Sequence, residues 1–211
     1  MKNKHILDLY FTLHKEYGSQ GWWPLSSIKT NNGYHPNNYK YPVTNQERFE
    51  ICVGAILTQN TSWKNVEKAI TNLKEINALN MLYFLDTPEA KIKQAIRPAG
   101  YFNQKYKKLV EFTKFFLSLK KRTPTRKEFL DIWGIGPETA DSILLYAYKE
   151  PIFVVDAYTK KLLLKNKMIP QAEKASYEDI QKLFMDNLER DYKLYQEYHA
   201  LIVANGKVKK I

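Results

Sequence analysis

The chain has 211 residues, with 33 lysines and arginines against 22 aspartates and glutamates, which gives a formal net charge of +11. Hydrophobic residues make up 44% and charged residues 26%, an ordinary globular composition that excludes a disordered tail, a collagen or a mucin. A positive surplus of this size favours a polyanionic partner, most often nucleic acid. A solvated, lysine-rich surface is the alternative.

The sequence also argues against metal sites and membrane segments. Its single cysteine, Cys52, excludes a disulfide framework and an all-cysteine zinc or iron–sulfur site within one chain. The four histidines, His5, His14, His35 and His199, have no metal-ligand spacing, and we interpret them as structural. No apolar run approaches 18 residues, and the basic start is not typical of a signal peptide. We expect an intracellular, cytoplasmic protein associated with the nucleoid.

Apolar residues recur at helical spacing along most of the chain. Phe49–Leu57 predicts one helix, and Trp63–Leu73 predicts a second that is capped by Thr61 or Ser62. The later expected helices are a short one with Pro88 at its first position and Pro98 and Gly100 at its end, then Tyr106–Leu117, one that a Thr125–Glu128 capping box begins, Glu138–Tyr148, Ala157–Lys165, Tyr177–Asn187 and Asp191–Val203. Only Ile152–Val155 reads as extended, so the predicted fold class is all-α.

The segment 25–46 is the exception, because it is rich in Asn, Pro and Tyr and has no periodicity. A connector of this length in a compact domain is usually functional or disordered. Its rings and prolines favour an ordered surface loop between an N-terminal helix and the main helical body.

Positive charge gathers between residues 103 and 127, where one acid, Glu111, stands among nine basic residues. The basic residues are Lys105, Lys107, Lys108, Lys114, Lys120, Lys121, Arg122, Arg126 and Lys127. The aromatic residues interleaved with them fit a core stripe better than a base-stacking platform. The charges alone therefore favour DNA.

The strongest local pattern is Gly134-Ile135-Gly136 between the helix after Thr125 and the helix that starts at Pro137. The glycines permit positive φ and a close backbone approach, while Ile135 suits the core between the helices. Free N–H groups at the second helix's start would suit a phosphate. The pattern resembles the helix-hairpin-helix motif of DNA-binding proteins, and an ordinary helical hairpin is the alternative.

A single carboxylate, Asp156, follows the extended run 151–155 and begins a helix. By itself it indicates an N-cap. With the hairpin about 20 residues upstream, however, the pattern resembles the endonuclease III (HhH-GPD) superfamily of DNA glycosylases, and within it the cluster-free 3-methyladenine DNA glycosylases. The likeness runs from about Gln46 to Lys207. It includes 54–61, similar to the family's strand-probing loop, 97–105, similar to a second DNA-facing turn, and Glu197-Tyr198-His199-Ala200.

The resemblance implies a role for each matching residue. Asp156 would be the catalytic carboxylate, which stabilises an oxocarbenium-like sugar and orients water. Gln59 and Tyr101 would fill the gap left by a flipped nucleotide or probe the opposite base. The implied DNA-binding set is Gln59, Tyr101, Gly134, Ile135, Gly136 and Thr139, and the implied base pocket is Trp22, Trp23, Pro24, Phe49, Glu138 and Lys207.

Two departures from the family pattern matter. Glu138 stands where strand-cutting members have a nucleophilic lysine, and a carboxylate cannot form an imine, so lyase chemistry by that route is not expected. Lys210 stands about where the first cysteine of a family iron–sulfur cluster would fall, so no cluster is expected. The resemblance implies no other cofactor except a monovalent cation at the hairpin carbonyls.

An aromatic, tryptophan-rich pocket favours an electron-poor or cationic base such as 3-methyladenine. Uracil, mismatch or oxidised-base removal stays an alternative, and so does a non-catalytic, structure-specific DNA-binding module. We expect a monomer that binds double-stranded DNA with a damaged base. The resemblance implies two helical domains with the active-site cleft between them: 47–149, with the hairpin at about 126–148, and 1–46 together with 150–211.

Overall fold

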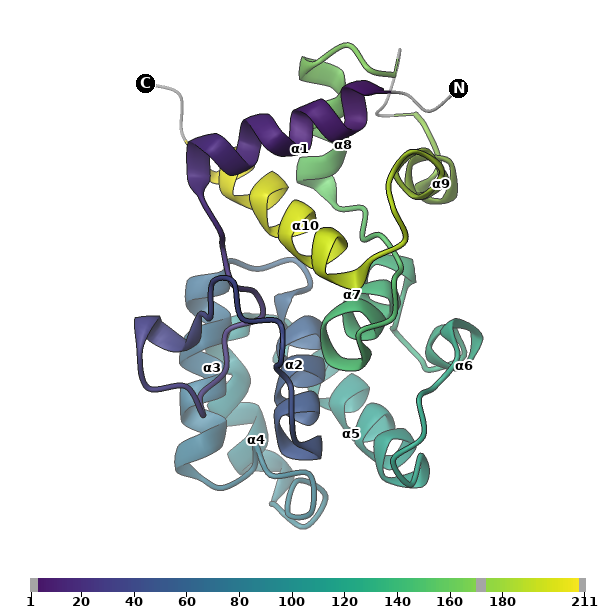
Figure 1. Ribbon diagram of the computed structural model, residues 1–211. Coiled ribbons are helices and arrows are strands. Elements are labelled where there is room, and N and C mark those ends of the chain that lie inside the picture. Colours follow the sequence, from purple (N-terminus) through teal and green to yellow (C-terminus); the bar gives the residue numbers. More distant parts are fainter. Residues whose placement is uncertain (1–3, 170–173, 209–211) are drawn as a thin grey trace. The chain divides into compact units, whose positions relative to one another are not determined.

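The computed structural model describes residues 4–169 and 174–208. Their packing forms two compact units. The first unit is made of the described residues up to 40 and from 144 onward, and the second unit is made of Tyr41–Ile143. All regular elements in these ranges are helices, and none of these residues lies in a strand (Figure 1). The all-α prediction is therefore confirmed.

Both ends of the chain contribute helices to the first unit. It contains α1 (Lys4–Tyr17), the short 3₁₀ turn η1 (Asn31–Gly33), the last turn of α7 (Pro137–Tyr148), α8 (Ala157–Lys165), α9 (Tyr177–Asn187) and α10 (Tyr192–Lys207). Helix α10 packs against α1 and α8 (Figure 1). The core of this unit is aromatic: the Phe153 ring stacks on Phe184 at 4.0 Å, and Tyr195 and Tyr198 pack edge-on against Phe153.

The second unit holds the middle of the chain. It contains α2 (Asn45–Thr58), α3 (Trp63–Glu75), α4 (Glu89–Ile96), the 3₁₀ turn η2 (Arg97–Ala99), α5 (Phe102–Ser118), α6 (Arg126–Leu130) and the first two turns of α7. Its core is a cluster of phenylalanine rings contributed by α2, α5, α6 and the connection before α4. These rings belong to Phe49, Phe84, Phe112, Phe116 and Phe129, and each is buried.

Capping groups fix the helix starts. The capping box of Thr125 and Glu128 is present as predicted. Ser62 occupies the cap position of α3 but makes no side-chain cap hydrogen bond. Pro88 is the cap of α4 and Glu89 its first helical residue, so the prediction that Pro88 is the first helical residue was wrong by one position. Pro88 has an extended ψ of 133°, which lies outside the helical range.

The observed unit boundaries fall earlier in the chain than the predicted ones at 46/47 and 149/150. At the first, the Glu47 side chain accepts from the backbone N–H groups of Val43 and Thr44 and so joins these residues to α2. At the second, Tyr146 in the last turn of α7 hydrogen-bonds to α10. The helix therefore passes from one unit to the other without a break.

The loop predicted at 25–46 is ordered by close backbone approaches. Gly21 has a φ of +69°, and a β-carbon there would lie 2.2 Å from the backbone nitrogen of Pro36. The buried imidazole of His35 contacts the carbonyl oxygens of Trp23 and Asn38. These contacts position the segment that carries the tandem tryptophans. Lys210 lies outside the described residues. No described helix has the length and apolar character that crossing a membrane requires.

Candidate active site and DNA interface

Asp156 lies at the N-terminus of α8 and caps it. Its Oδ1 accepts from the Thr159 backbone N–H at 2.7 Å and from the Thr159 hydroxyl at 2.8 Å. Its side chain keeps 11% of its surface exposed. Burial raises the pKa of Asp156, but His199 and the two Thr159 donors outweigh burial and hold that pKa below its ordinary value. The carboxylate is therefore ionised, fixed in direction and still accessible.

The carboxylate has a buried histidine behind it. Nε2 of His199 lies 3.7 Å from Oδ2 of Asp156, within ion-pair range, and Nδ1 lies 2.7 Å from the hydroxyl of Tyr146. The sequence gives His199 no role beyond structure, although it lies in the matched segment Glu197–Ala200. Only the fold brings it to Asp156, because the two residues come from separate helices.

The tandem tryptophans lie in the same unit as Asp156. The Trp22 ring is half-buried and packs edge-on against His199 at 5.8 Å, while Trp23 is buried and packs against Tyr146 at 5.3 Å. Lys207, at the end of α10, is exposed and holds its ammonium 5.5 Å from the centre of the Trp22 ring. Asp156 and Trp22 therefore both lie against His199, and Lys207 lies against Trp22. Pro24, which follows Trp23 in the sequence, is half-buried.

Phe49 belongs to the second unit. Its side chain is 0% exposed, and its ring packs against Phe84, Phe112 and Phe116. These contacts make it a core residue of its unit and leave no exposed surface to offer a base. Its predicted place in the base pocket stays a prediction, and none of these contacts supports it.

The hairpin has the predicted construction. Helices α6 and α7 span 126–148, Gly134 has a φ of +81°, and Ile135 is buried. Gly136 is exposed, and a β-carbon added there would have no heavy atom within 4 Å. A tie between the two helices was not predicted: the guanidinium of Arg126 donates to both oxygens of the fully buried Asp141, at 2.7 and 3.1 Å.

Gln59 at the end of α2 is tied to this hairpin. Its Nε2 donates to the carbonyl oxygen of Gly134 at 3.1 Å and to the Thr139 hydroxyl at 2.9 Å, while its Oε1 accepts from Lys108. In this structure Gln59 therefore braces the hairpin, and Thr139 is buried as its partner. A carbonyl oxygen has two lone pairs, so Gly134 can still serve a monovalent cation, which remains a prediction.

Tyr101 is 66% exposed, and its φ of +47° turns the chain sharply before α5. Just after it, Lys105 differs from expectation. The sequence places Lys105 among the DNA-facing charges, but it is 2% exposed and donates to the carbonyl oxygens of Leu57 and Ala99, each at 2.8 Å. Its ammonium group therefore lies in the interior of the unit, where it links the turn at Gln59 to the turn at Tyr101.

Glu138 is exposed in the first turn of α7, within the second unit, where its carboxylate is at the favourable end of the helix dipole. The structure thus gives it a role in the helix start. Its predicted proximity to a bound base stays a prediction.

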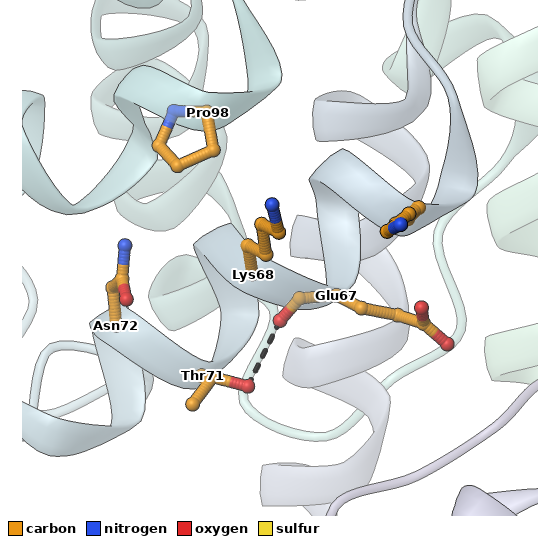
Figure 2. A pocket seen from close by; sticks show the side chains of 6 residues that line it. Glu67, Lys68, Thr71, Asn72 and Pro98 are labelled. Atoms are coloured by element: carbon orange, nitrogen blue, oxygen red, sulfur yellow. Dashed lines mark hydrogen bonds between the residues drawn. The ribbon is translucent and has the colours of Figure 1, made fainter.

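The second unit also has an open hollow of about 420 Å³ on α3 (Figure 2). The residues that line it are of polar types apart from one proline: Lys64, Glu67, Lys68, Thr71, Asn72 and Pro98. It contains no aromatic ring and none of the predicted site residues, so it does not suit a flipped base. Among residues 4–169 and 174–208, no group of three or more His, Cys, Asp or Glu side chains could hold a metal ion.

Known proteins share the sequence and the fold of this chain. Residues 53–190 match the family model of the HhH-GPD superfamily base excision DNA repair protein. MJ1434 of Methanocaldococcus jannaschii, a relative assigned to the DNA repair glycosylases, is 43% identical over 98% of this chain and 89% of its own length. Endonuclease III of Thermotoga maritima is 26% identical over 60% of this chain and 58% of its own.

Solved structures give the same result. Helicobacter pylori 3-methyladenine DNA glycosylase (MagIII), determined with 1,N6-ethenoadenine, superposes with a TM-score of 0.74 at 27% identity over the whole of both chains. A non-covalent DNA complex of endonuclease III gives 0.74 at 17% identity over 96% of this chain and 85% of that one, which shows the shared fold. The chain therefore belongs to the HhH-GPD superfamily of base excision DNA repair proteins, as an endonuclease III-like DNA glycosylase.

Proposed function

We propose that the protein is a monofunctional DNA glycosylase that removes 3-methyladenine or a related alkylated purine from double-stranded DNA. One observation carries the proposal: the ionised carboxylate of Asp156 and the half-buried indole of Trp22 both contact the same histidine. In this proposal Trp22 offers the base a stacking surface and Asp156 offers its sugar a negative charge. The ethenoadenine bound to MagIII, a 27% identical relative, supports a modified purine as the ligand.

In the proposed reaction the base leaves with the electron pair of its N-glycosidic bond, and the deoxyribose C1′ becomes positively charged. Asp156 stabilises that charge electrostatically and directs a water molecule to C1′. The water's oxygen forms the new bond, its proton is lost to the base or to solvent, and the products are a free base and an abasic site. A positively charged base such as 3-methyladenine also stacks well on indole.

Glu138 supports the absence of lyase activity, because a carboxylate cannot replace a lysine amine as an imine-forming nucleophile. The single cysteine supports an enzyme without an iron–sulfur cluster, since such clusters need four cysteine ligands in this family. A monomer that binds duplex DNA and works in the cytoplasm, near the nucleoid, completes the proposal.

The test is a panel of duplexes, each with one lesion, incubated with enzyme and then treated with alkali. We expect strand breaks after alkali with 3-methyladenine or ethenoadenine and intact strands without alkali. Borohydride should trap no covalent adduct. Removal of uracil or 8-oxoguanine but of no alkylated purine would overturn the substrate. Trapping that disappears in Lys207→Ala would overturn the monofunctional mechanism, and binding without any excision would favour a DNA-binding module.

A further inference from the structure

The nine basic residues between 103 and 127 differ in the groups that their charges meet. Four of them form ion pairs with carboxylates: Lys114 with Glu111, Arg122 with Glu128, Arg126 with Asp141 and Lys127 with Asp131. Lys105 donates to buried carbonyl oxygens, and Lys108 donates to the Gln59 amide. The exposed lysines for which the described part of the chain provides no carboxylate partner are Lys107, Lys120 and Lys121. A polyanion therefore meets the least competition at these three.

Lys107 differs from the other two lysines in its place. It lies near the start of α5, whereas Lys120 and Lys121 follow the end of that helix, about 16 Å or more away along its axis. The ammonium of Lys107 lies 4.3 Å from the centre of the Trp133 ring. Trp133 immediately precedes Gly134 in the hairpin turn. The charge of Lys107 is therefore held at the hairpin.

Trp133 leaves much of its indole in water. It is 49% exposed, although a tryptophan contributes most to stability when its large ring is buried. Exposed tryptophans are enriched where proteins bind partners. A ring that holds the Lys107 ammonium also restricts a long side chain that otherwise loses about 2 kcal/mol of rotamer entropy when it is fixed. The pair is thus partly ordered before a ligand arrives.

Lys108 brings a second positive charge to the same turn. Its side chain runs across Gly134, where an added β-carbon would overlap it, and its ammonium reaches Gln59. The hairpin also carries the exposed Glu138 in the first turn of α7, and a negative charge there opposes a phosphate. The two lysines from α5 counter that charge and favour a polyanion at the turn.

We propose that Lys107, positioned by the Trp133 ring, contacts a phosphate of the duplex backbone beside the hairpin. This rests on the proposed glycosylase function, which makes DNA the ligand. An unpaired ammonium matches a phosphate in charge, and DNA carries one negative charge per about 1.7 Å of its axis. Phosphates carry no sequence information, so the contact strengthens binding to all duplexes alike.

The main variant for the test is Lys107→Gln, which removes the charge. Trp133→Leu removes the ring and keeps an apolar side chain, whereas Trp133→Phe keeps a ring. Lys91→Gln is the matched control, because Lys91 is an exposed lysine of the same unit on α4, also without a carboxylate partner among the described residues. Affinity for two undamaged duplexes of unrelated sequence is measured over a series of salt concentrations, and urea unfolding checks that each variant folds.

We expect the slope of log K against log salt to become shallower by about 0.9 in Lys107→Gln. If variant and wild type bind equally at 1 M salt, that slope makes the variant about eightfold weaker at 0.1 M salt. Trp133→Leu should weaken binding about two- to fivefold, the value of an exposed cation–π contact, and Trp133→Phe should weaken it less. Both duplexes should respond alike, and Lys91→Gln should keep the wild-type slope.

Three results would overturn the proposal. An unchanged slope in Lys107→Gln would show that Lys107 meets no phosphate, and it would favour an acidic protein segment as the partner of this pair. Equal flattening in Lys91→Gln would show a diffuse effect of net charge. An equal effect of Trp133→Leu with and without Lys107 would show that the ring does not act through the lysine. Absence of excision from every lesion by the wild type, with the expected salt slopes present, would refute the glycosylase function instead.

Discussion

Replacing the buried Lys105 by methionine should loosen the two turns that carry Gln59 and Tyr101. Methionine fills similar space but cannot donate to the carbonyl oxygens of Leu57 and Ala99, which then lose the partners shown in the structure. Hydrogen bonds from a charged donor contribute about 1.5–3 kcal/mol each. The variant also avoids the cost of burying an ammonium group, which partly offsets that loss.

The size of this offset follows from the pKa. Burial, with a smaller effect of the Lys108 charge, lowers the pKa of Lys105 from 10.5 to about 8. The full shift corresponds to about 3 kcal/mol. Two bonds contribute about 3–6 kcal/mol together, so subtracting the burial cost leaves a loss of stability of about 0–3 kcal/mol for Lys105→Met at pH 7.

The loss should grow with pH. Because the folded pKa lies below the unfolded one, the unfolded chain binds more protons between about pH 8 and 10.5, and wild-type stability rises through this window. The variant lacks this gain, so the difference should widen by about 2 kcal/mol from pH 7 to pH 10.

Urea unfolding followed by tryptophan fluorescence at both pH values measures this difference. Lys114→Met is the control, because Lys114 lies on the same helix with its side chain 59% exposed. Equal stability of Lys105→Met and wild type at pH 7 would show that the two carbonyl contacts contribute no more than the burial of the ammonium group costs. A difference that shrinks with rising pH would show that the carbonyls hold the charged form more strongly than burial opposes it.

Three further changes test the hairpin, the loop and the pocket. Gly136→Asp should weaken binding to all duplex sequences alike, and the slope of log K against log salt should become shallower by about 0.9 for each lost phosphate contact. Gly136→Ala is the control and should bind like wild type, because its β-carbon would have open space. Equal salt slopes in the two variants would argue against the hairpin as the DNA anchor. Gly21→Ala places a β-carbon 2.2 Å from the Pro36 backbone nitrogen and should lower the free energy of unfolding by about 2–4 kcal/mol in urea titrations, and an unchanged midpoint would contradict that close approach. Trp22→Ala should reduce removal of 3-methyladenine at least tenfold in single-turnover assays while duplex binding holds, with Trp63→Ala of the second unit as control; unaffected excision would exclude Trp22 from the pocket.

Most helices could be predicted from the sequence because their causes are local. Apolar spacing and capping residues lie within a few positions of each other, so α8 and α9 begin and end where the periodicity indicated. The Gly134–Gly136 turn was equally recognisable, since its residue types are tied to its backbone geometry. The family likeness extended this local reading to the fold as a whole.

The burial of Lys105 could not be predicted from the local composition. Among nine basic residues it looked like one more surface charge, yet its register places it four residues before the buried Leu109, on the apolar face of α5. That spacing was available as a signal. The partners of its ammonium were not, because Leu57 and Ala99 come from other elements.

His199 shows the same limit at the candidate active site. Helical spacing places it on the buried face of α10 but does not say which groups meet it there. Its contacts with Asp156, Tyr146 and Trp22 join residues from distant parts of the chain. Only packing brings them together, so sequence reasoning identified the carboxylate and missed the histidine that lies beside it.

Single-turnover excision of 3-methyladenine by Asp156→Asn, measured beside binding of the same duplex, tests the proposed mechanism most directly. Asparagine can still accept the Thr159 bonds that cap α8, so the variant removes the charge and keeps the local structure. We predict a rate at least about a hundredfold below wild type, with damaged-duplex affinity nearly unchanged. Full excision by Asp156→Asn would contradict the mechanism and leave Asp156 as a helix cap alone.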